Sequence, residues 1–338
     1  MFLIQQTGVA IGVCLLAMLC WGSWSNGQKL VADAKVPITL FYRDYVLGIL
    51  LLTAVLVSTL GSFGSQGRPF VADVRQAAGS GLGLVLAAGL VFNLGNQLLV
   101  AAIQAAGLAI AMPVGSGIAL ALGLVVNYVA EPQGNVWLLA AGGALVLVSI
   151  ACSAVAYAKK AGDKDQGGKS GNSQQGLLIA GAAGVANGFF FRMVTSPLAK
   201  DFAHPKAGAL TPYTALALFG LGLALSNPVV EQVLRHFADT PEAAQVRYSE
   251  VAARQHGIGI GSGVLWGAGM AALLLASTKA GNAVSFGLSQ GATIVAVLWG
   301  LFAWHEFKDA PAPAYRWLWA MAIAYVLGVG LIVAARLG

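Results

Sequence analysis

Residues 76–130 read QAAGSGLGLVLAAGLVFNLGNQLLVAAIQAAGLAIAMPVGSGIALALGLVVNYVA, which is 55 residues without one charged side chain. A single membrane-spanning helix needs about 20 apolar residues, because a helix rising ~1.5 Å per residue must cross a hydrocarbon layer about 30 Å thick. The stretch is therefore too long for one span. It predicts two spans joined by a tight turn, which we expect at 104–107, and it indicates an α-helical membrane protein.

The composition of the whole chain supports this class. Of 338 residues, 58% are hydrophobic and 9% are charged, and the mean hydropathy is +0.76. Soluble domains carry about 25% charged residues, so a soluble enzyme and a disordered protein are both excluded. The net charge of +6 resides in short loops, which predicts a lipid bilayer and no nucleic acid as a partner. Cys14, Cys20 and Cys152 all lie in apolar runs and are expected to be buried, without disulfides or a metal.

Further charge-free windows predict the remaining spans. These windows are 1–28, 45–67, 136–158, 176–197, 208–233, 257–278, 281–303 and 314–336. Residues 159–175 have the polar composition of a flexible linker. The chain should therefore be a first five-helix unit (1–158), a linker and a second five-helix unit (176–338). We expect the charged loop 231–256 to hold a short surface helix. Residues 1–6 lack Lys and Arg, so the first run is expected to be a retained span and not a signal peptide.

The two halves resemble each other locally. GLAIAMPVGSG (107–117) and GNAVSFGLSQG (281–291) share three residues at one offset of 174, and each segment leads into a span that ends at a glutamate, Glu131 or Glu306. Five spans per half would place the second half upside down in the membrane. Two inverted repeats are a common architecture of secondary transporters.

Five motifs along the chain point to a family. They are MLCWGSWSNGQK (18–29), NLGNQ (93–97), AMPVGSG (111–117), NY (127–128) and LWGLFAWHEF (298–307). In this order they resemble the drug/metabolite transporter superfamily, in the branch of the glucose/ribose porters, the rhamnose–proton symporter and the ureide permeases. The resemblance covers essentially the whole chain. It implies a ten-span fold, one central solute site and import coupled to protons or sodium.

Polar side chains at membrane depth are costly, so each is a candidate for function. Aromatic faces can stack on the C–H face of a sugar or on a planar amide, and amide side chains both donate and accept hydrogen bonds. Trp21 and Trp24 could instead form an interfacial aromatic belt, and serines often bond to their own helix backbone. The predicted solute-binding residues are Trp21, Trp24, Asn26, Gln28, Tyr42, Asn93, Asn96, Gln97, Asn187, Phe190, Trp266, Ser289 and Gln290.

Two charged residues are predicted to couple transport to protons. Asp44 is the acidic residue nearest the interior of a span, and a carboxylate withdrawn from water binds a proton more readily than an exposed one. Arg192 lies well inside the sixth span and could pair with Asp44. The alternatives are that Asp44 anchors the helix at the interface and that Arg192 reaches to the headgroups.

The sequence thus predicts a secondary transporter that imports a small polar solute by alternating access. A sugar, pentose or hexose, is the first choice and a proton is the co-transported ion, with sodium as the alternative. A ureide or nucleobase permease is the main rival, and a drug or metabolite exporter is a weaker one.

We find no catalytic motif, no phosphate-binding loop for ATP and no metal-ligand spacing among the histidines, so no enzyme activity and no cofactor are expected. We expect a multi-pass protein of a bacterial inner membrane, as a monomer or homodimer. The richer set of basic residues lies on the linker side, which favours an outside N-terminus.

Overall fold

The computed structural model describes residues 1–32, 36–106, 108–161, 173–237 and 246–337. Of the residues in these ranges, 80% are helical. Within the described ranges there is no β-strand, and the extended contacts are two isolated bridges, Ala77 with Gly208 and Leu198 with Leu210. The predicted all-α class is confirmed.

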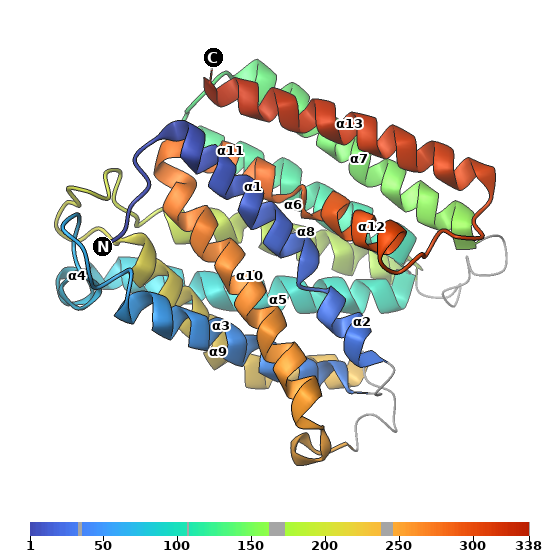
Figure 1. Ribbon diagram of the computed structural model, residues 1–338, viewed down its shortest axis with the longest axis horizontal. Helices are drawn as coiled ribbons and strands as arrows, with labels where there is room; N and C mark the ends of the chain where they lie inside the picture. Colours follow the sequence, from blue (N-terminus) through green and yellow to red (C-terminus); the bar gives the residue numbers. More distant parts are fainter. Residues whose placement is uncertain (33–35, 107, 162–172, 238–245, 338) are drawn as a thin grey trace. The chain divides into compact units, whose positions relative to one another are not determined.

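The helices follow one another as labelled in Figure 1. Their bounds are α1 (Thr7–Ser23), α2 (Asn26–Ala32), α3 (Ile38–Ser58), α4 (Phe70–Gln76), α5 (Gly79–Ala106), α6 (Leu108–Ala130), α7 (Val136–Ala161), α8 (Ser173–Thr195), α9 (Pro212–Phe237), the 3₁₀ turn η2 (Tyr248–Glu250), α10 (Ala253–Ala280), α11 (Asn282–Ser289), α12 (Ala292–Phe302) and α13 (Ala312–Leu337). Ten segments of the described chain are long and apolar enough to cross a membrane, and they match the ten predicted spans.

Two of the ten spans are broken. The first consists of α1 and α2, which are separated at residues 24–25, and the ninth consists of α11 and α12, separated at residues 290–291. A break frees backbone groups inside the membrane region, and such discontinuous helices commonly line solute sites in transporters. Both breaks coincide with predicted solute residues, Trp24 and Gln290.

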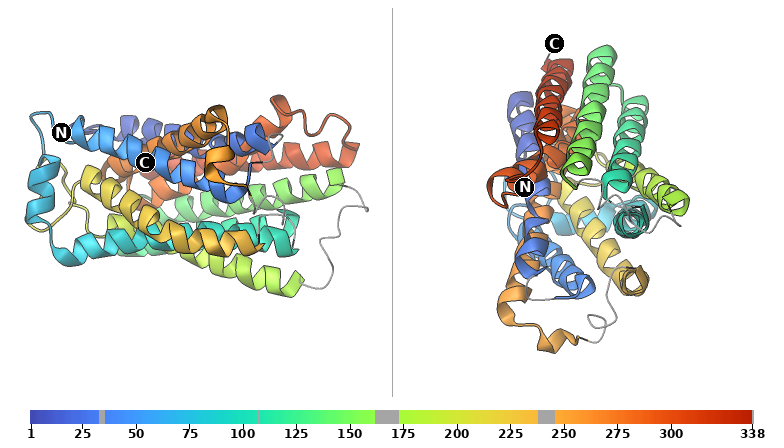
Figure 2. Two further views of the ribbon diagram at one scale, coloured as in Figure 1. Left: turned by 90° about the horizontal axis from the view of Figure 1, so that it is seen from below. Right: turned by 90° about the vertical axis from the view of Figure 1, so that its right-hand side faces the viewer.

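Several predicted boundaries shift in the structure. The second span starts at Ile38, so Asp44 lies inside a helix and not before it. The outer residues of the predicted linker are helical, because α7 runs to Ala161 and α8 begins at Ser173, while 162–172 and Gly107 lie outside the described residues. The short helix expected in the charged loop is η2, which precedes α10 (Figure 2).

The helices group into two compact units, each built from both halves of the sequence. Unit 1 comprises residues 1–93 and 190–280, and unit 2 comprises residues 94–189 and 281–338. Helices α5 and α8 each contribute to both units. The predicted five-helix units on either side of 159–175 are therefore not the two groups in which the helices pack. Whether these two halves of the sequence arose as inverted repeats stays a prediction.

Unit 1 is organised around α10, which packs along α1 and α3 (Figure 1). Glycines make the contact with α3 close. A Cβ atom on Gly263 would lie 1.9 Å from the carbonyl oxygen of Tyr45, and one on Gly48 would lie 2.1 Å from that of Ile260. Small residues of this kind let helix backbones approach within the membrane, where packing replaces the hydrophobic effect.

Unit 2 contains the long antiparallel pair α7 and α13, which lie side by side in Figure 1. Gly142 and Gly328 meet there, and a Cβ atom on Gly142 would lie 2.7 Å from the carbonyl oxygen of Gly328. The Ser149 hydroxyl donates to the carbonyl of Met321 at 3.0 Å. The backbones of α7 and α13 are thus in close contact along this pair.

Candidate solute and proton site

The glycines of α10 also position two side chains of α3. A Cβ atom on Gly259 would lie 2.6 Å from the Cβ of Asp44, so only a residue without a side chain leaves room for Asp44 there. Asp44 is 1% exposed and the neighbouring Tyr45 is fully buried. The close contact between α3 and α10 therefore creates the surroundings of both residues.

An aromatic cluster fills the interior of unit 1, and its ring centroids lie 4.8–6.3 Å from their neighbours, a usual range for aromatic pairs. Its members are Trp21, Trp24, Tyr42, Tyr45, Phe92, Phe190, Phe191, Phe219 and Trp266. Five of the predicted solute residues thus meet in one cluster, although they come from α1, α3, α8, α10 and the break after α1.

Trp266 lies at the centre of this cluster and is 3% exposed. The ring of Trp21 stacks on it at 5.3 Å and 7°, and the ring of Phe219 stacks on it at 5.9 Å and 16°. The Trp21 indole N–H donates to the carbonyl of Trp266 at 3.1 Å. In this conformation the faces of the aromatic rings are occupied by one another.

Two buried polar atoms beside the aromatic rings have no hydrogen-bond partner among the described residues. One is the hydroxyl of Tyr45 and the other is the Oδ1 atom of Asn93. The amide nitrogen of Asn93 donates to the Ser226 hydroxyl at 2.9 Å, so half of this side chain is held in place. Buried polar atoms without partners are costly and rare, and they indicate where a polar solute could supply the missing bonds.

Asp44 lies in a polar cluster next to the aromatic residues. The Tyr248 hydroxyl donates a short hydrogen bond to its Oδ1 atom, and Nδ1 of His256 lies 2.7 Å from its Oδ2 atom. The Nε2 atom of His256 lies 3.1 Å from the backbone carbonyl oxygen of Tyr248. These contacts bind the turn η2 and the start of α10 to the first third of α3.

A separate ion pair lies beside this cluster. Arg43 donates from Nε and Nη2 to the two carboxylate oxygens of Glu231, each at 2.8 Å. A bidentate pair of this kind is strong and directional. The Arg43 guanidinium also lies 5.9 Å from the ring centroid of Tyr248. Glu231 thus neutralises the arginine adjacent to Asp44.

The hydrogen bond to Asp44 raises the pKa of Tyr248 to about 12, and desolvation of its hydroxyl adds to the effect. The phenol therefore stays protonated at every physiological pH. It acts as a permanent donor to the Asp44 carboxylate and not as a titrating group.

The predicted pairing of Asp44 with Arg192 does not occur. Asp44 is bound by Tyr248 of η2 and His256 of α10. Its neighbour Arg43 pairs with Glu231 in the C-terminal half of α9, whereas Arg192 is in the last turn of α8, shortly before α9 begins. The 26 residues of α9 span about 39 Å. The geometry joins Asp44 to Tyr248 and His256 and gives Arg192 no part in its surroundings.

The remaining predicted residues of unit 1 lie at the break in the first span. The Asn26 side chain donates to the carbonyl of Ser23 at 2.8 Å, which satisfies the end of α1. Gln28 is half-buried on α2, and Gly27 next to it packs against Ser262 of α10. Asn26 thus has a clear structural role at the break.

Unit 2 holds the other predicted amides. Gln97 is 1% exposed, and neither of its amide atoms has a partner in the described chain. The Oδ1 atom of Asn187 is likewise unpaired, and a Cβ atom on Gly95 would lie 2.7 Å from it, so α5 and α8 touch there. Asn96 is half-buried. Unit 2 therefore presents a second set of unsatisfied buried amides.

The two residues predicted from the ninth span differ. The Ser289 hydroxyl donates to the carbonyl of Phe286 at 2.7 Å, so it is bound to its own helix. Gln290 is half-buried at the end of α11, where the span breaks. Of the two, Gln290 keeps the geometry of a candidate.

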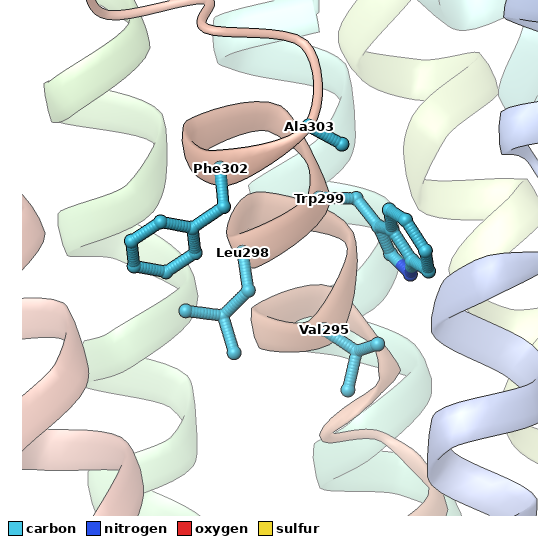
Figure 3. Close-up of a pocket in the computed structure, with 5 residues that line it drawn as sticks. All are labelled: Val295, Leu298, Trp299, Phe302 and Ala303. Carbon is cyan, nitrogen blue, oxygen red and sulfur yellow. The ribbon is translucent and has the colours of Figure 1, made fainter.

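An open pocket of about 350 Å³ lies along α12 in unit 2. It is lined by Val295, Leu298, Trp299, Phe302 and Ala303 (Figure 3). These side chains are apolar, and the outer ones are exposed, as expected for a surface in contact with acyl chains. The pocket does not offer the hydrogen bonds that a polar solute requires.

Comparisons with known proteins agree with this fold and with the predicted family. A family model described as sugar transport protein matches residues 242–335. Ureide permease 1 of Arabidopsis thaliana is 24% identical to this chain over an alignment of 393 positions, which covers 99% of each protein. Ureide permease 3 of the same plant is 25% identical, and the alignment covers 67% of this chain and 73% of the permease. A solved crystal structure has the same fold, with a TM-score of 0.60, 17% identity and 98% of each chain covered.

The chain is similar to the sugar and ureide transporters of the drug/metabolite superfamily. It is a multi-pass membrane transporter whose partners are a small-molecule solute and the lipid bilayer. The role of each site residue in this transporter stays a prediction.

Sequence reasoning missed three residues around Asp44: Tyr248 and His256, which contact it, and Glu231, which pairs with the adjacent Arg43. Glu231, Tyr248 and His256 were assigned to a charged surface loop, because they lie between two apolar windows. The sequence held one signal for these residues. Tyr248 and His256 directly precede a stripe of glycines at every fourth residue, Gly259, Gly263 and Gly267. Such a stripe indicates that another helix packs closely against this span, but it does not identify that helix.

Proposed function

We propose that this transporter imports a small polar solute together with a proton. The observation that carries the proposal is the association, within unit 1, of an aromatic cluster, two unsatisfied buried polar atoms and a buried carboxylate. The hydroxyl of Tyr45 and the Oδ1 atom of Asn93 would bind solute hydroxyl or amide groups, and the ring faces around Trp266 would stack on its flat or C–H face. Asp44 would carry the proton. The membrane would be a bacterial inner membrane, whose proton gradient would drive uptake.

A sugar is the first candidate for the solute. The family model named for sugar transport covers the start of α10, including His256 and Trp266, and so includes part of both the polar and the aromatic cluster. A ureide is the second candidate, and the full-length alignment with ureide permease 1 favours it. The near-parallel stacking on Trp266 would suit a planar ureide in the place of one ring.

Transport would follow alternating access, in which a closed and an open form exchange around one solute site. The stacked rings of Trp21, Trp266 and Phe219 would correspond to the closed form without solute. A solute would separate one ring from Trp266 and supply hydrogen bonds that the closed form lacks. The energy of binding would then shift the population toward the occupied form.

Binding and uptake are tested separately. The purified protein is screened by thermal shift against hexoses, pentoses, ureides and nucleobases, since a ligand stabilises the fold by about 2.7 kcal/mol at a hundred times its Kd. Stabilisation by sugars supports the first candidate, and stabilisation by ureides alone replaces it with the second. Uptake into proteoliposomes is then measured with an imposed pH gradient, and accumulation that ignores the gradient rejects proton coupling.

Trp266→Leu tests the site in the same assay, because it removes the stacking face while keeping an apolar side chain. We expect solute stabilisation to disappear. Trp319→Leu, an exposed residue of α13, is the matched control and should bind solute as the wild type does. Solute stabilisation that persists in Trp266→Leu would show that the aromatic cluster is not the binding site.

A further inference from the structure

The hydrogen-bond contacts of His256 determine how many protons it shares with its neighbours. Its Nδ1 atom faces a carboxylate oxygen of Asp44 at 2.7 Å, and its Nε2 atom faces the backbone carbonyl oxygen of Tyr248 at 3.1 Å. Both oxygens are acceptors, and the backbone carbonyl can be nothing else. Both ring nitrogens therefore need a hydrogen between themselves and the oxygen they face.

A neutral imidazole beside a charged carboxylate cannot meet this requirement. It has one N–H, so one ring nitrogen would present its lone pair to an oxygen lone pair at hydrogen-bond distance. One added proton removes the conflict. It lies between Nδ1 of His256 and Oδ2 of Asp44, while the Nε2–H donates to the carbonyl of Tyr248. Whether the nitrogen or the oxygen holds this proton, the pair contains the same number of protons.

The other carboxylate oxygen of Asp44 is already in use. It accepts the hydrogen bond from the Tyr248 hydroxyl, so the added proton must lie on the side of His256. Asp44, Tyr248 and His256 thus form a closed ring of contacts, which we call the latch. It joins α3 to η2 and α10 at one end of unit 1.

We propose that the latch is a binding site for one transported proton, and that its closed form exists only with the proton bound. When the proton leaves to water, a lone pair on His256 faces an oxygen, one hydrogen bond is lost and η2 separates from α3. The proposal deepens the proposed function, since it rests on proton coupling for its role in transport. It adds His256 as the partner that shares the proton and Tyr248 as the residue that links the proton to movement of the loop.

The surrounding charges do not replace this proton. Arg43 on α3 is held by both oxygens of Glu231 on α9. The described charged groups of the other neighbouring elements are exposed, and they are Lys29 on α2, Arg247 and Glu250 on η2, and Arg254 on α10. Arg247 and Glu250 also pair with each other at 4.0 Å. With the proton the buried groups are electrically balanced, and without it they carry one uncompensated negative charge.

Two substitutions remove the exchangeable proton of the latch while keeping all or some of its hydrogen bonds. In Asp44→Asn the amide N–H takes the place of the shared proton and donates to Nδ1 of a neutral His256, while the amide oxygen still accepts from Tyr248. This variant keeps every contact of the closed latch without a removable proton. In His256→Asn the new amide can donate to Asp44 without an added proton, but the contact to the carbonyl of Tyr248 is lost.

Hydrogen–deuterium exchange of the backbone at 246–252 measures the latch in the purified, solute-free protein. Protection factors are taken relative to an unstructured peptide at each pH, because chemical exchange itself depends on pH. The closed form binds one more proton than the open form, so protection should fall as pH rises, by up to about tenfold per pH unit. In Asp44→Asn the protection factor should be high at every pH and should not change with pH. In His256→Asn the protection factor should also be constant with pH, but lower.

His204→Asn is the matched control, because His204 also contacts an aspartate, Asp201, at 3.1 Å, but in an exposed loop. It should keep the wild-type slope. A wild-type protection factor that is constant with pH, or a slope that survives in Asp44→Asn, would overturn the proposal, as would loss of the slope in His204→Asn.

The latch and the proposed function can fail separately. A latch that switches with pH in a protein whose uptake ignores the proton gradient would keep the latch as a proton site but reject proton coupling and the role of the latch in transport. Proton-driven uptake with a latch that does not respond to pH would reject the latch and leave the coupling to another group.

Discussion

Among the described residues of unit 1, two aspartates are buried, and they differ in their partners. Asp44 is 1% exposed and is bound by a histidine and a tyrosine. Asp73, on α4, is fully buried and accepts hydrogen bonds from Nη1 of Arg68 at 2.9 Å and from the backbone N–H of Thr211 at 2.8 Å. Gln76 adds a third donor at 3.2 Å.

The partners decide what each carboxylate can do. An arginine stays charged and a backbone N–H always donates, so the bonds of Asp73 do not depend on pH in the physiological range. Arg68 also donates to the carbonyls of Pro205 and Ala209, which ties α4 to the segment before α9. A histidine can lose its proton near neutral pH. Equal burial therefore yields a fixed structural tie at Asp73 and a reversible one at Asp44.

The largest expected difference concerns transport. Asp44→Asn should abolish proton-driven accumulation of solute, because the latch then has no proton to release, while solute binding in the thermal-shift assay persists. Proteoliposome uptake with and without a pH gradient measures this. Proton-driven uptake at the wild-type rate in this variant would contradict our assignment of Asp44.

The second difference concerns stability. Asp73→Ala should lower the stability of the fold by about 3 kcal/mol, because it leaves the half-buried Arg68 guanidinium and the buried backbone N–H of Thr211 without their acceptor. The loss should be the same across the physiological pH range, and thermal melting in detergent measures it. Asp201→Ala, at an exposed aspartate, is the control and should change stability by about 0.5 kcal/mol or less. A marked pH dependence of the Asp73→Ala loss would remove the contrast with Asp44.

The contact that buries Asp44 can be broken through its glycines. Gly263→Ala places a Cβ atom against the Tyr45 carbonyl and should cost about 1–3 kcal/mol, because two helix backbones must separate. Gly261→Ala is the matched control two residues away, since nothing lies within 4 Å of its new Cβ. It should be neutral or stabilising by up to about 1 kcal/mol. Equal melting temperatures for the two variants would argue against close packing of α3 and α10.

The smallest effect is expected from Tyr248→Phe. It removes one hydrogen bond to a carboxylate in a partly exposed position, so the latch should weaken by about 1 kcal/mol and protection at 246–252 should fall about fivefold. In the closed latch the pKa of Tyr248, raised to about 12 by this hydrogen bond, keeps the hydroxyl donating throughout the physiological pH range, so the loss in Tyr248→Phe should be the same at every pH at which the latch is closed. Wild-type protection in Tyr248→Phe would show that this bond does not hold the latch.

The number of spans and their order could be predicted from the sequence because the membrane imposes a simple rule. A segment of about 20 residues must be apolar to cross, and each charge-free window meets that rule. The same rule identified Asn93, Gln97 and Asn187 as exceptions, and the structure leaves buried amide atoms of all three without partners. Local composition is sufficient for such inferences, since the penalty for a polar group depends on membrane depth and not on which helix lies beside it.

The sequence by itself therefore determined that this protein is a ten-span membrane protein with polar groups at depth, and it singled out Asp44. Only the tertiary structure decided that Asp44 meets Tyr248 and His256, more than 200 residues away, and not Arg192. The reason is physical. Hydrophobicity specifies that a helix enters the membrane, but inside it every apolar neighbour is nearly equivalent, and the choice depends on close packing at positions such as Gly259 and Gly263 that only the folded chain brings together.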